Sequence, residues 1–204
     1  IEHCFLVIQS LKNLLKSKKL LINVGDEGGF APSISSNEEA LELIIEAIEL
    51  AKLKPGKEIS ICLDVAANEL VNKEGNYAIQ SENYINVDQS IEYYKKIVSK
   101  YPIKSIEDPF AEDDWVAWSK LTSEIGHNTQ IVGDDLFVTN KKRLQKGIEL
   151  KSANCILIKP NQIGTLTETL NVIELAKNNN FKTIISHRSG DSEDTFIADL
   201  AVKT

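Results

Sequence analysis

The sequence predicts an α/β fold with a parallel sheet. Short β-branched runs alternate with amphipathic helical patterns five or six times, at spacings of roughly 25–45 residues. In addition, single charged residues directly follow most of the β-branched runs. This alternation is typical of strands joined by crossover helices, so each element is considered in turn.

The first third of the chain predicts two helices around a glycine-rich turn. Apolar residues between Cys4 and Leu15 recur at helical spacing. An apolar stretch at 20–24 is expected as a first strand and leads into the turn 25–29. Ser36 followed by Glu39 forms a capping box, which predicts the start of the second helix.

The middle third predicts two strands and a hairpin. The run 59–63 is expected as a strand ending on Asp64, and a hairpin is expected around 74–76. A helix begins near Asp88 and stops before Pro102, because proline cannot continue a helix. The next strand, at 103–106, ends on Glu107.

The last third repeats the same pattern three times. Asn140 and the pair Thr165 and Glu168 predict helix starts, and a last helix is expected near Ser192. Trp115 and Trp118 lie about one turn apart on a short helix and are expected in the core. The strands of this part are expected at 131–132, 155–158 and 183–186.

Two folds fit this alternation of strands and helices, a doubly wound sheet and a TIM-type barrel. Charged or polar residues end five of the predicted strands: Asp64, Glu107, Asp134, Lys159 and His187. In a barrel these strand ends converge on one mouth, where catalytic groups belong. We therefore favour the barrel, with six of its eight strands in residues 1–204, as one domain that is incomplete at both ends.

Composition narrows the class of protein. The 204 residues are 42% hydrophobic, and the net charge of −7 is spread along the chain, which argues against a nucleic-acid partner. No apolar run has the length of a membrane span, and no secretory pattern opens the chain. Cys4, Cys62 and Cys155 show no metal-ligand spacing, so a reducing cytoplasm is expected, with Cys62 and Cys155 buried and inert. A start at Ile1 without any methionine predicts an excerpt from a longer protein.

The strand-end carboxylates predict a metal site. Asp64, Glu107 and Asp134 offer oxygen ligands, which Mg²⁺ prefers, and would leave positions for water or substrate. Three crowded negative charges repel one another unless a cation neutralises them. For any one of these carboxylates alone, capping a helix or pairing with a base is an equally good interpretation.

Other candidate residues have a functional and a structural interpretation. Lys159 could act as a base or form a salt bridge with Asp134 or Glu107. Glu27 lies in a glycine-rich segment that is also a simple turn signal. The run His187, Arg188 and Ser189 offers donors suited to a phosphate, or a packed strand end.

Five motifs together resemble the bacterial-type enolase family, specifically its C-terminal barrel domain. They occur in the family's order and cover almost the whole chain. The motifs are VGDEGGFAP at 24–32, SIEDPF at 105–110, GDDLFVTN at 133–140, IKPNQIGTL at 158–166 and ISHRSG at 185–190.

The resemblance implies an Mg²⁺-dependent lyase that interconverts 2-phosphoglycerate and phosphoenolpyruvate. It implies that Lys159 is the base and Glu27 the acid, that Arg188 contacts phosphate, and that Ser189 and His187 lie beside the substrate. The metal ligands implied are Asp64, Glu107 and Asp134. The resemblance also implies a homo-oligomer for the full-length protein and a cytoplasmic enzyme, with relatives also found at the cell surface.

Departures from the family are mostly absences. Nothing in the chain matches the family's N-terminal α+β capping domain or its second active-site lysine segment. We therefore expect the isolated chain to be inactive even if the parent protein is an enolase. The alternatives are a non-catalytic scaffold or surface-binding protein and, less well supported, a sugar-acid dehydratase of the same superfamily.

Overall fold

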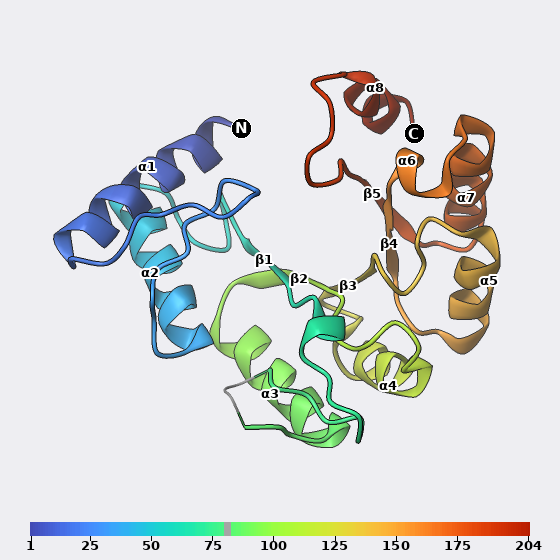
Figure 1. The fold of residues 1–204 in the computed structure, drawn as a ribbon, viewed down its shortest axis with the longest axis horizontal. Helices are drawn as coiled ribbons and strands as arrows, with labels where there is room; N and C mark the ends of the chain where they lie inside the picture. Colours follow the sequence, from blue (N-terminus) through green and yellow to red (C-terminus); the bar gives the residue numbers. More distant parts are fainter. Residues whose placement is uncertain (80–82) are drawn as a thin grey trace. The chain divides into compact units, whose positions relative to one another are not determined.

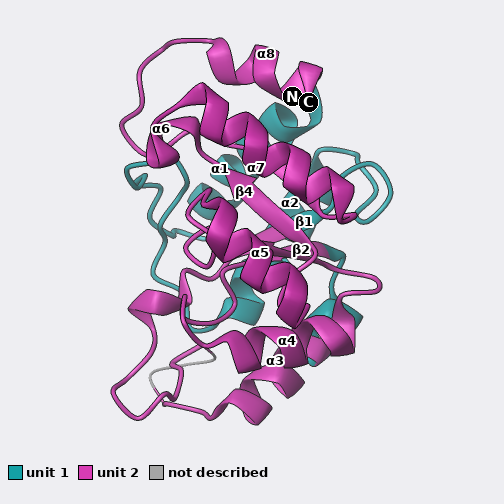
Figure 2. Ribbon diagram, turned by 90° about the vertical axis from the view of Figure 1, so that its right-hand side faces the viewer, with its two compact units in different colours: residues 1–61, 96–103 teal, residues 62–95, 104–204 magenta. Residues whose placement is uncertain are grey.

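The computed structural model describes residues 1–79 and 83–204, which form two compact units (Figure 2). The first unit comprises residues 1–61 and 96–103, and the second comprises residues 62–95 and 104–204. None of the helices in the described residues has the length and apolar content that a membrane crossing requires.

The first unit is built on two helices, α1 (Glu2–Ser17) and α2 (Asn37–Leu50) (Figure 1). Ser36 caps α2 as predicted, since its Oγ accepts a hydrogen bond from the backbone N–H of Glu39 at 3.1 Å. The two helices pack through buried apolar side chains, which are Val7, Leu14, Leu15, Leu43, Ala47 and Ile48.

The strand predicted at 20–24 was wrong. Leu20 and Ile22 pack against the buried cluster of α1 and α2, and Leu21 is exposed. Val24 makes a single antiparallel bridge to Phe30, which closes the glycine-rich turn. The apolar residues of this segment are therefore used to cover helices, and a lone bridge gives no ladder that could continue as a strand.

The sheet lies in the second unit, except for the first residues of β1 and β2 (Figure 1). Its strands follow one another in sequence order, and the pairs β2–β3, β3–β4 and β4–β5 are parallel. The strands are β1 (Ile61–Asp64), β2 (Ile103–Glu107), β3 (Gln130–Gly133), β4 (Cys155–Ile158) and β5 (Lys182–Ile185).

This strand order separates the two folds that the sequence left open. A doubly wound sheet reverses its strand order at a switch point, whereas here every strand pairs with the next one along the chain. Sequential parallel pairing is the arrangement of a barrel wall. The parallel α/β prediction is confirmed, with five strands rather than six among the described residues.

Helices connect the strands where the caps predicted them. Asn140 caps α5 and Thr165 caps α7, each by accepting backbone N–H groups of the first turn. The last helix begins at Phe196, because Asp194 Oδ1 accepts the Phe196 N–H at 2.8 Å and holds the preceding segment in a turn. The helices are α3 (Val87–Lys100), α4 (Trp115–Ile125), α5 (Lys141–Leu150), α6 (Pro160–Ile163), α7 (Leu166–Asn178) and α8 (Phe196–Lys203), with a short 3₁₀ turn at Ala67–Glu69.

Of three smaller predictions, two are confirmed and one is wrong. The hairpin around 74–76 is confirmed by antiparallel bridges from Tyr77 to Val71 and to Ile85. Cys155 is buried as expected, but Cys62 is exposed. Cys62 lies on β1, which is at one edge of the sheet, so it lacks a neighbouring strand on one side.

The Phe137 ring fills a slot that two glycines leave open. Phe137 is fully buried and contacts the rings of Trp115 and Phe181, with centroids 6.4 and 6.1 Å away. A Cβ on Gly133, at the end of β3, or on Gly147, in α5, would lie less than 3.0 Å from this ring. The slot fixes the segment that follows β3 against α5.

We expect Gly147→Ala to destabilise the chain. Overpacking a well-packed site costs about 1–3 kcal/mol, whereas alanine gains at most about 1 kcal/mol of helix propensity over glycine. Urea unfolding should show a lower midpoint for Gly147→Ala. Phe137→Leu in the Gly147→Ala background should recover part of the loss. A stability equal to or above the parent chain would contradict the role of the slot.

Candidate functional site

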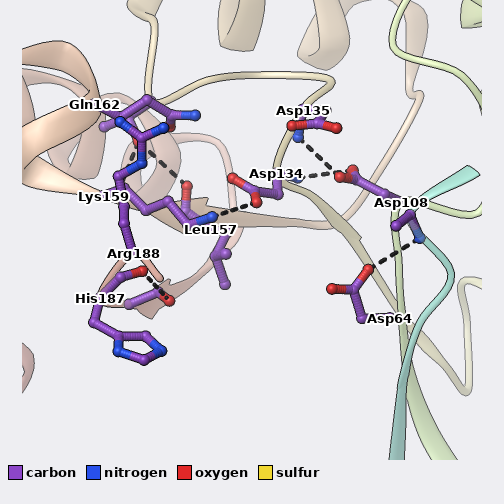
Figure 3. Close-up of polar contacts among 12 residues, drawn as sticks. Asp64, Asp108, Asp134, Asp135, Leu157, Lys159, Gln162, His187 and Arg188 are labelled. Atoms are coloured by element: carbon purple, nitrogen blue, oxygen red, sulfur yellow. Dashed lines mark hydrogen bonds and ion pairs between the residues drawn. The ribbon is translucent and has the colours of Figure 1, made fainter. Parts of the chain in front are cut away.

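Four of the predicted site residues lie at one edge of the sheet in the second unit. Asp64 and Glu107 are the last residues of β1 and β2, while Asp134 and Lys159 directly follow β3 and β4. Because neighbouring parallel strands end at the same edge, these side chains project from one rim. Figure 3 shows Asp134 and Lys159 pointing toward each other, with Asp64 farther along the rim.

Lys159 and Asp134 form a close ion pair. Lys159 Nζ donates to Asp134 Oδ2 at 2.5 Å, and both side chains are largely buried. The salt bridge that the sequence offered as the structural role of Lys159 is therefore present in this geometry. It leaves a function for Lys159 as a base open, because the same contact places its amine at the carboxylate rim.

The second oxygen of Asp134 has no partner. Within residues 1–79 and 83–204, Asp134 Oδ1 is the buried side-chain oxygen or nitrogen that lacks a hydrogen bond. A buried oxygen of this kind is costly unless a ligand occupies it. The donor set around it consists of carboxylates, which suit a hard divalent cation, so the residues present fit a metal ion.

The electrostatics of the rim point the same way. Burial, followed by the negative charges of Asp64 and Asp134, raises the pKa of Glu107 to about 8. Burial also raises the pKa of Asp64, and the hydrogen bond from the Ala66 N–H opposes that rise. The protein thus holds acidic groups where their ionised forms are unfavourable, as expected of a site that a cation completes.

A fourth carboxylate, Asp108, was missed by sequence reasoning. One oxygen each from Asp108, Asp134 and Asp135 lies within 4.8 Å of the others, a group that could hold a metal ion. Burial raises the pKa of Asp108 to about 7. The only sequence signal was the doubled acid at two neighbouring strand ends, at 107–108 and 134–135, which does not tell the two members of a pair apart.

The loop after β5 carries His187, Arg188 and Ser189. His187 and Arg188 are exposed, and β5 pairs with β4, so this loop leaves the sheet next to the strand that Lys159 follows (Figure 3). Asp191 holds the loop closed, because its Oδ2 accepts the Arg188 N–H and an amide N–H of Asn161, both at 3.3 Å. The binding role of the three residues stays a prediction.

Glu27 belongs to the first unit. It lies in the turn 25–29, where the Gly25 N–H donates to the Gly29 carbonyl at 2.9 Å and Gly28 has a φ of +83°. A positive φ explains the glycine at position 28. The turn predicted from the sequence is confirmed, and the acid role of Glu27 stays a prediction.

We expect Glu107→Gln to stabilise the metal-free chain at high pH. With a folded pKa near 8 against an ordinary value of 4.5, Glu107 holds its proton longer in the folded state. The protonated Glu107 therefore favours the folded state, and this contribution to the free energy of unfolding is lost as the pH rises from about 4.5 to about 8. Glutamine removes that loss, so the variant should match the parent near pH 5 and melt several degrees higher near pH 9.

The measurement is thermal unfolding in the presence of a chelator across this pH range. Glu174→Gln is the matched control, since Glu174 is exposed on α7 and should change the unfolding curve equally little at every pH. A Glu107→Gln effect that is independent of pH would contradict the electrostatic account.

Comparison with known proteins identifies the family. A family described as "Enolase, C-terminal TIM barrel domain" matches residues 3–204. The chain is 63% identical over 201 residues to an enolase of Pelagibacter ubique, an alignment that covers 98% of this chain and 48% of that protein. It is 56% identical over 197 residues to an enolase of Helicobacter pylori strain J99, which covers 96% of this chain and 46% of that protein. The chain thus spans about half the length of the curated relatives it matches, and over that span it belongs to the enolase family, in the C-terminal TIM barrel domain.

Proposed function

We propose that this chain carries the catalytic barrel of an enolase, which interconverts 2-phosphoglycerate and phosphoenolpyruvate. The observation that carries the proposal is the rim of Asp64, Glu107 and Asp134 with Lys159 at its end, in a chain that belongs to the enolase family. Because the chain matches about half of its relatives, the activity is proposed for the whole protein.

The proposed metal is Mg²⁺, held by Asp64, Glu107 and Asp134. The unpartnered Asp134 Oδ1 and the raised pKa of Glu107 support this set, since the first is a buried oxygen without a hydrogen bond and the second is a buried carboxyl beside other acids. When bound, the ion would supply positive charge that stabilises the second negative charge on the substrate carboxylate after proton removal.

The proposed base is Lys159. Its amine would take the proton from the carbon next to the substrate carboxylate, and the position of Nζ beside Asp134, at the metal rim, supports this role. We propose that Arg188, Ser189 and His187 bind the substrate, with the Arg188 guanidinium suited to phosphate. The role of Glu27 as the acid that assists loss of the 3-hydroxyl rests on the resemblance alone.

Three further proposals concern the whole protein. We propose that residues 1–204 form part of a single barrel domain, that the full-length protein is a homo-oligomer, and that it works in the cytoplasm. The family match over residues 3–204 supports the first of these. The other two rest on the resemblance to enolases.

The decisive test transplants this chain into a relative. Residues 3–204 would replace the matching half of the Pelagibacter ubique enolase, and phosphoenolpyruvate formation would be followed by absorbance with 2-phosphoglycerate and Mg²⁺. We expect the chimera to be active and its Lys159→Ala variant to lose on the order of 10²–10⁴-fold in kcat, the usual contribution of a general base.

Lys142→Ala serves as the control for loss of a lysine, since Lys142 is exposed at the start of α5. The 204-residue chain, assayed alone, should be inactive. A folded chimera that binds Mg²⁺ but makes no phosphoenolpyruvate would favour the scaffold interpretation over catalysis.

Mg²⁺ affinity tests the ligand set separately from turnover. Asp134→Asn removes the negative charge of the carboxylate to which the unpartnered oxygen belongs. We therefore expect Mg²⁺ to bind on the order of 10–100-fold more weakly by calorimetric titration. Asp199→Asn, on the exposed side of α8, should bind Mg²⁺ as the parent does. Equal affinities for the Asp134→Asn variant and the parent would refute the metal assignment.

A further inference from the structure

Asp108 is bonded through both carboxylate oxygens to the backbone that follows β3. Its carboxylate is 4% exposed and accepts two backbone hydrogen bonds, from the Asp134 N–H on Oδ1 and from the Asp135 N–H on Oδ2, both at 2.9 Å (Figure 3). The two bonds fix the peptide on either side of the Asp134 Cα. They therefore determine where the Asp134 side chain starts.

The backbone of Asp108 is bonded to β3 and to the 3₁₀ turn that follows β1. Its N–H donates to the Val132 carbonyl at 3.0 Å, and its carbonyl accepts the Ala67 N–H at 3.1 Å. Asp108 adopts a φ of +41°, a conformation that residues other than glycine rarely take. Such a conformation persists only where surrounding contacts hold it, and here the Asp108 carboxylate is bonded to the two residues that follow β3.

The two hydrogen bonds of the Asp108 carboxylate to Asp134 and Asp135 form a clamp on the backbone. A further hydrogen bond holds the Asp135 side chain. Asn68, in the turn after β1, donates from Nδ2 to Asp135 Oδ2 at 2.8 Å. The same amide accepts the Glu112 N–H on Oδ1 at 2.9 Å. The segments that follow β1, β2 and β3 are thus linked through the Asn68 side chain.

These bonds separate Asp108 from the proposed ligands. Both of its oxygens already accept N–H groups, whereas Asp134 keeps one oxygen without a partner. An oxygen already used by the backbone is a poorer ligand than a free one, because binding a cation there would weaken an existing buried hydrogen bond. The geometry suits a support better than a metal ligand.

We propose that Asp108 is a positioning residue, whose carboxylate clamps the backbone of Asp134 and Asp135 and so holds the Asp134 carboxylate in place for the cation. The inference rests on the proposed metal role of Asp134. Partners that orient a ligand typically contribute 10–100-fold to metal affinity.

Asp108→Asn tests the clamp with little change in shape. The amide oxygen can still accept one N–H, but the amide nitrogen then faces the other N–H, so half of the clamp is lost. We expect Mg²⁺ to bind about 10–100-fold more weakly, and amide hydrogen exchange at residues 134 and 135 to become faster in the metal-free chain.

Asp113→Asn is the matched control. Asp113 lies in the same loop and loses the same charge, but its side chain is 76% exposed and takes no part in the clamp. Its Mg²⁺ affinity and its exchange at 134–135 should equal those of the parent. A drop in affinity as large as that of Asp108→Asn would assign the effect to net charge and overturn the clamp.

The remaining outcomes separate this inference from the proposed function. Unchanged affinity in Asp108→Asn beside weakened affinity in Asp134→Asn overturns the positioning role alone. Unchanged affinity in both overturns the metal assignment and the inference with it. If Asp108→Asn does not fold, exchange in the parent chain decides: slow amides at 134 and 135 without metal support the clamp, and fast ones overturn it.

Discussion

The crowding of carboxylates at the carboxyl edge of the sheet is the constraint on which the rest of the second unit depends. Each acid there is held by a different means. Lys159 pairs with one oxygen of Asp134, backbone N–H groups hold both oxygens of Asp108, and the pKa of Glu107 rises to about 8. Burial and, after it, repulsion between the acids make their ionised forms unfavourable. The strands nevertheless fix the acids at neighbouring positions, which is also what a divalent cation requires.

Packing beneath the rim serves the same end. The Phe137 ring occupies the space that Gly133 and Gly147 leave free, so the segment after β3 is fixed from below by apolar contact. From the side, the same segment is fixed by the carboxylate of Asp108. A side chain supported by two independent kinds of contact loses little further freedom when it binds a ligand, which is the general advantage of a preorganised site.

Local sequence signals predicted local structure well. The caps at Ser36, Asn140 and Thr165 begin helices as expected, because a side-chain oxygen needs only the next three residues to find its partner. The failures share a different cause. The segment 20–24 has the composition of a strand, but its apolar side chains pack on α1 and α2. Cys62 has the composition of a buried strand position, but β1 lies at the sheet edge. In both cases long-range neighbours decided.

By itself the sequence determined the parallel α/β class, the family and the strand ends that carry Asp64, Glu107, Asp134 and Lys159, because these follow from short-range patterns and long motifs. Only the tertiary structure decided between a sequential and a reversed strand order, and only it paired Lys159 with Asp134. It also separated Asp108 from its neighbour Glu107, through contacts with residues 26 and 27 positions away. The physical reason is that hydrogen bonds and ion pairs across a sheet join residues far apart in sequence. Two adjacent acids such as Glu107 and Asp108 are therefore distinguished only by the partners that the folded chain places beside each side chain.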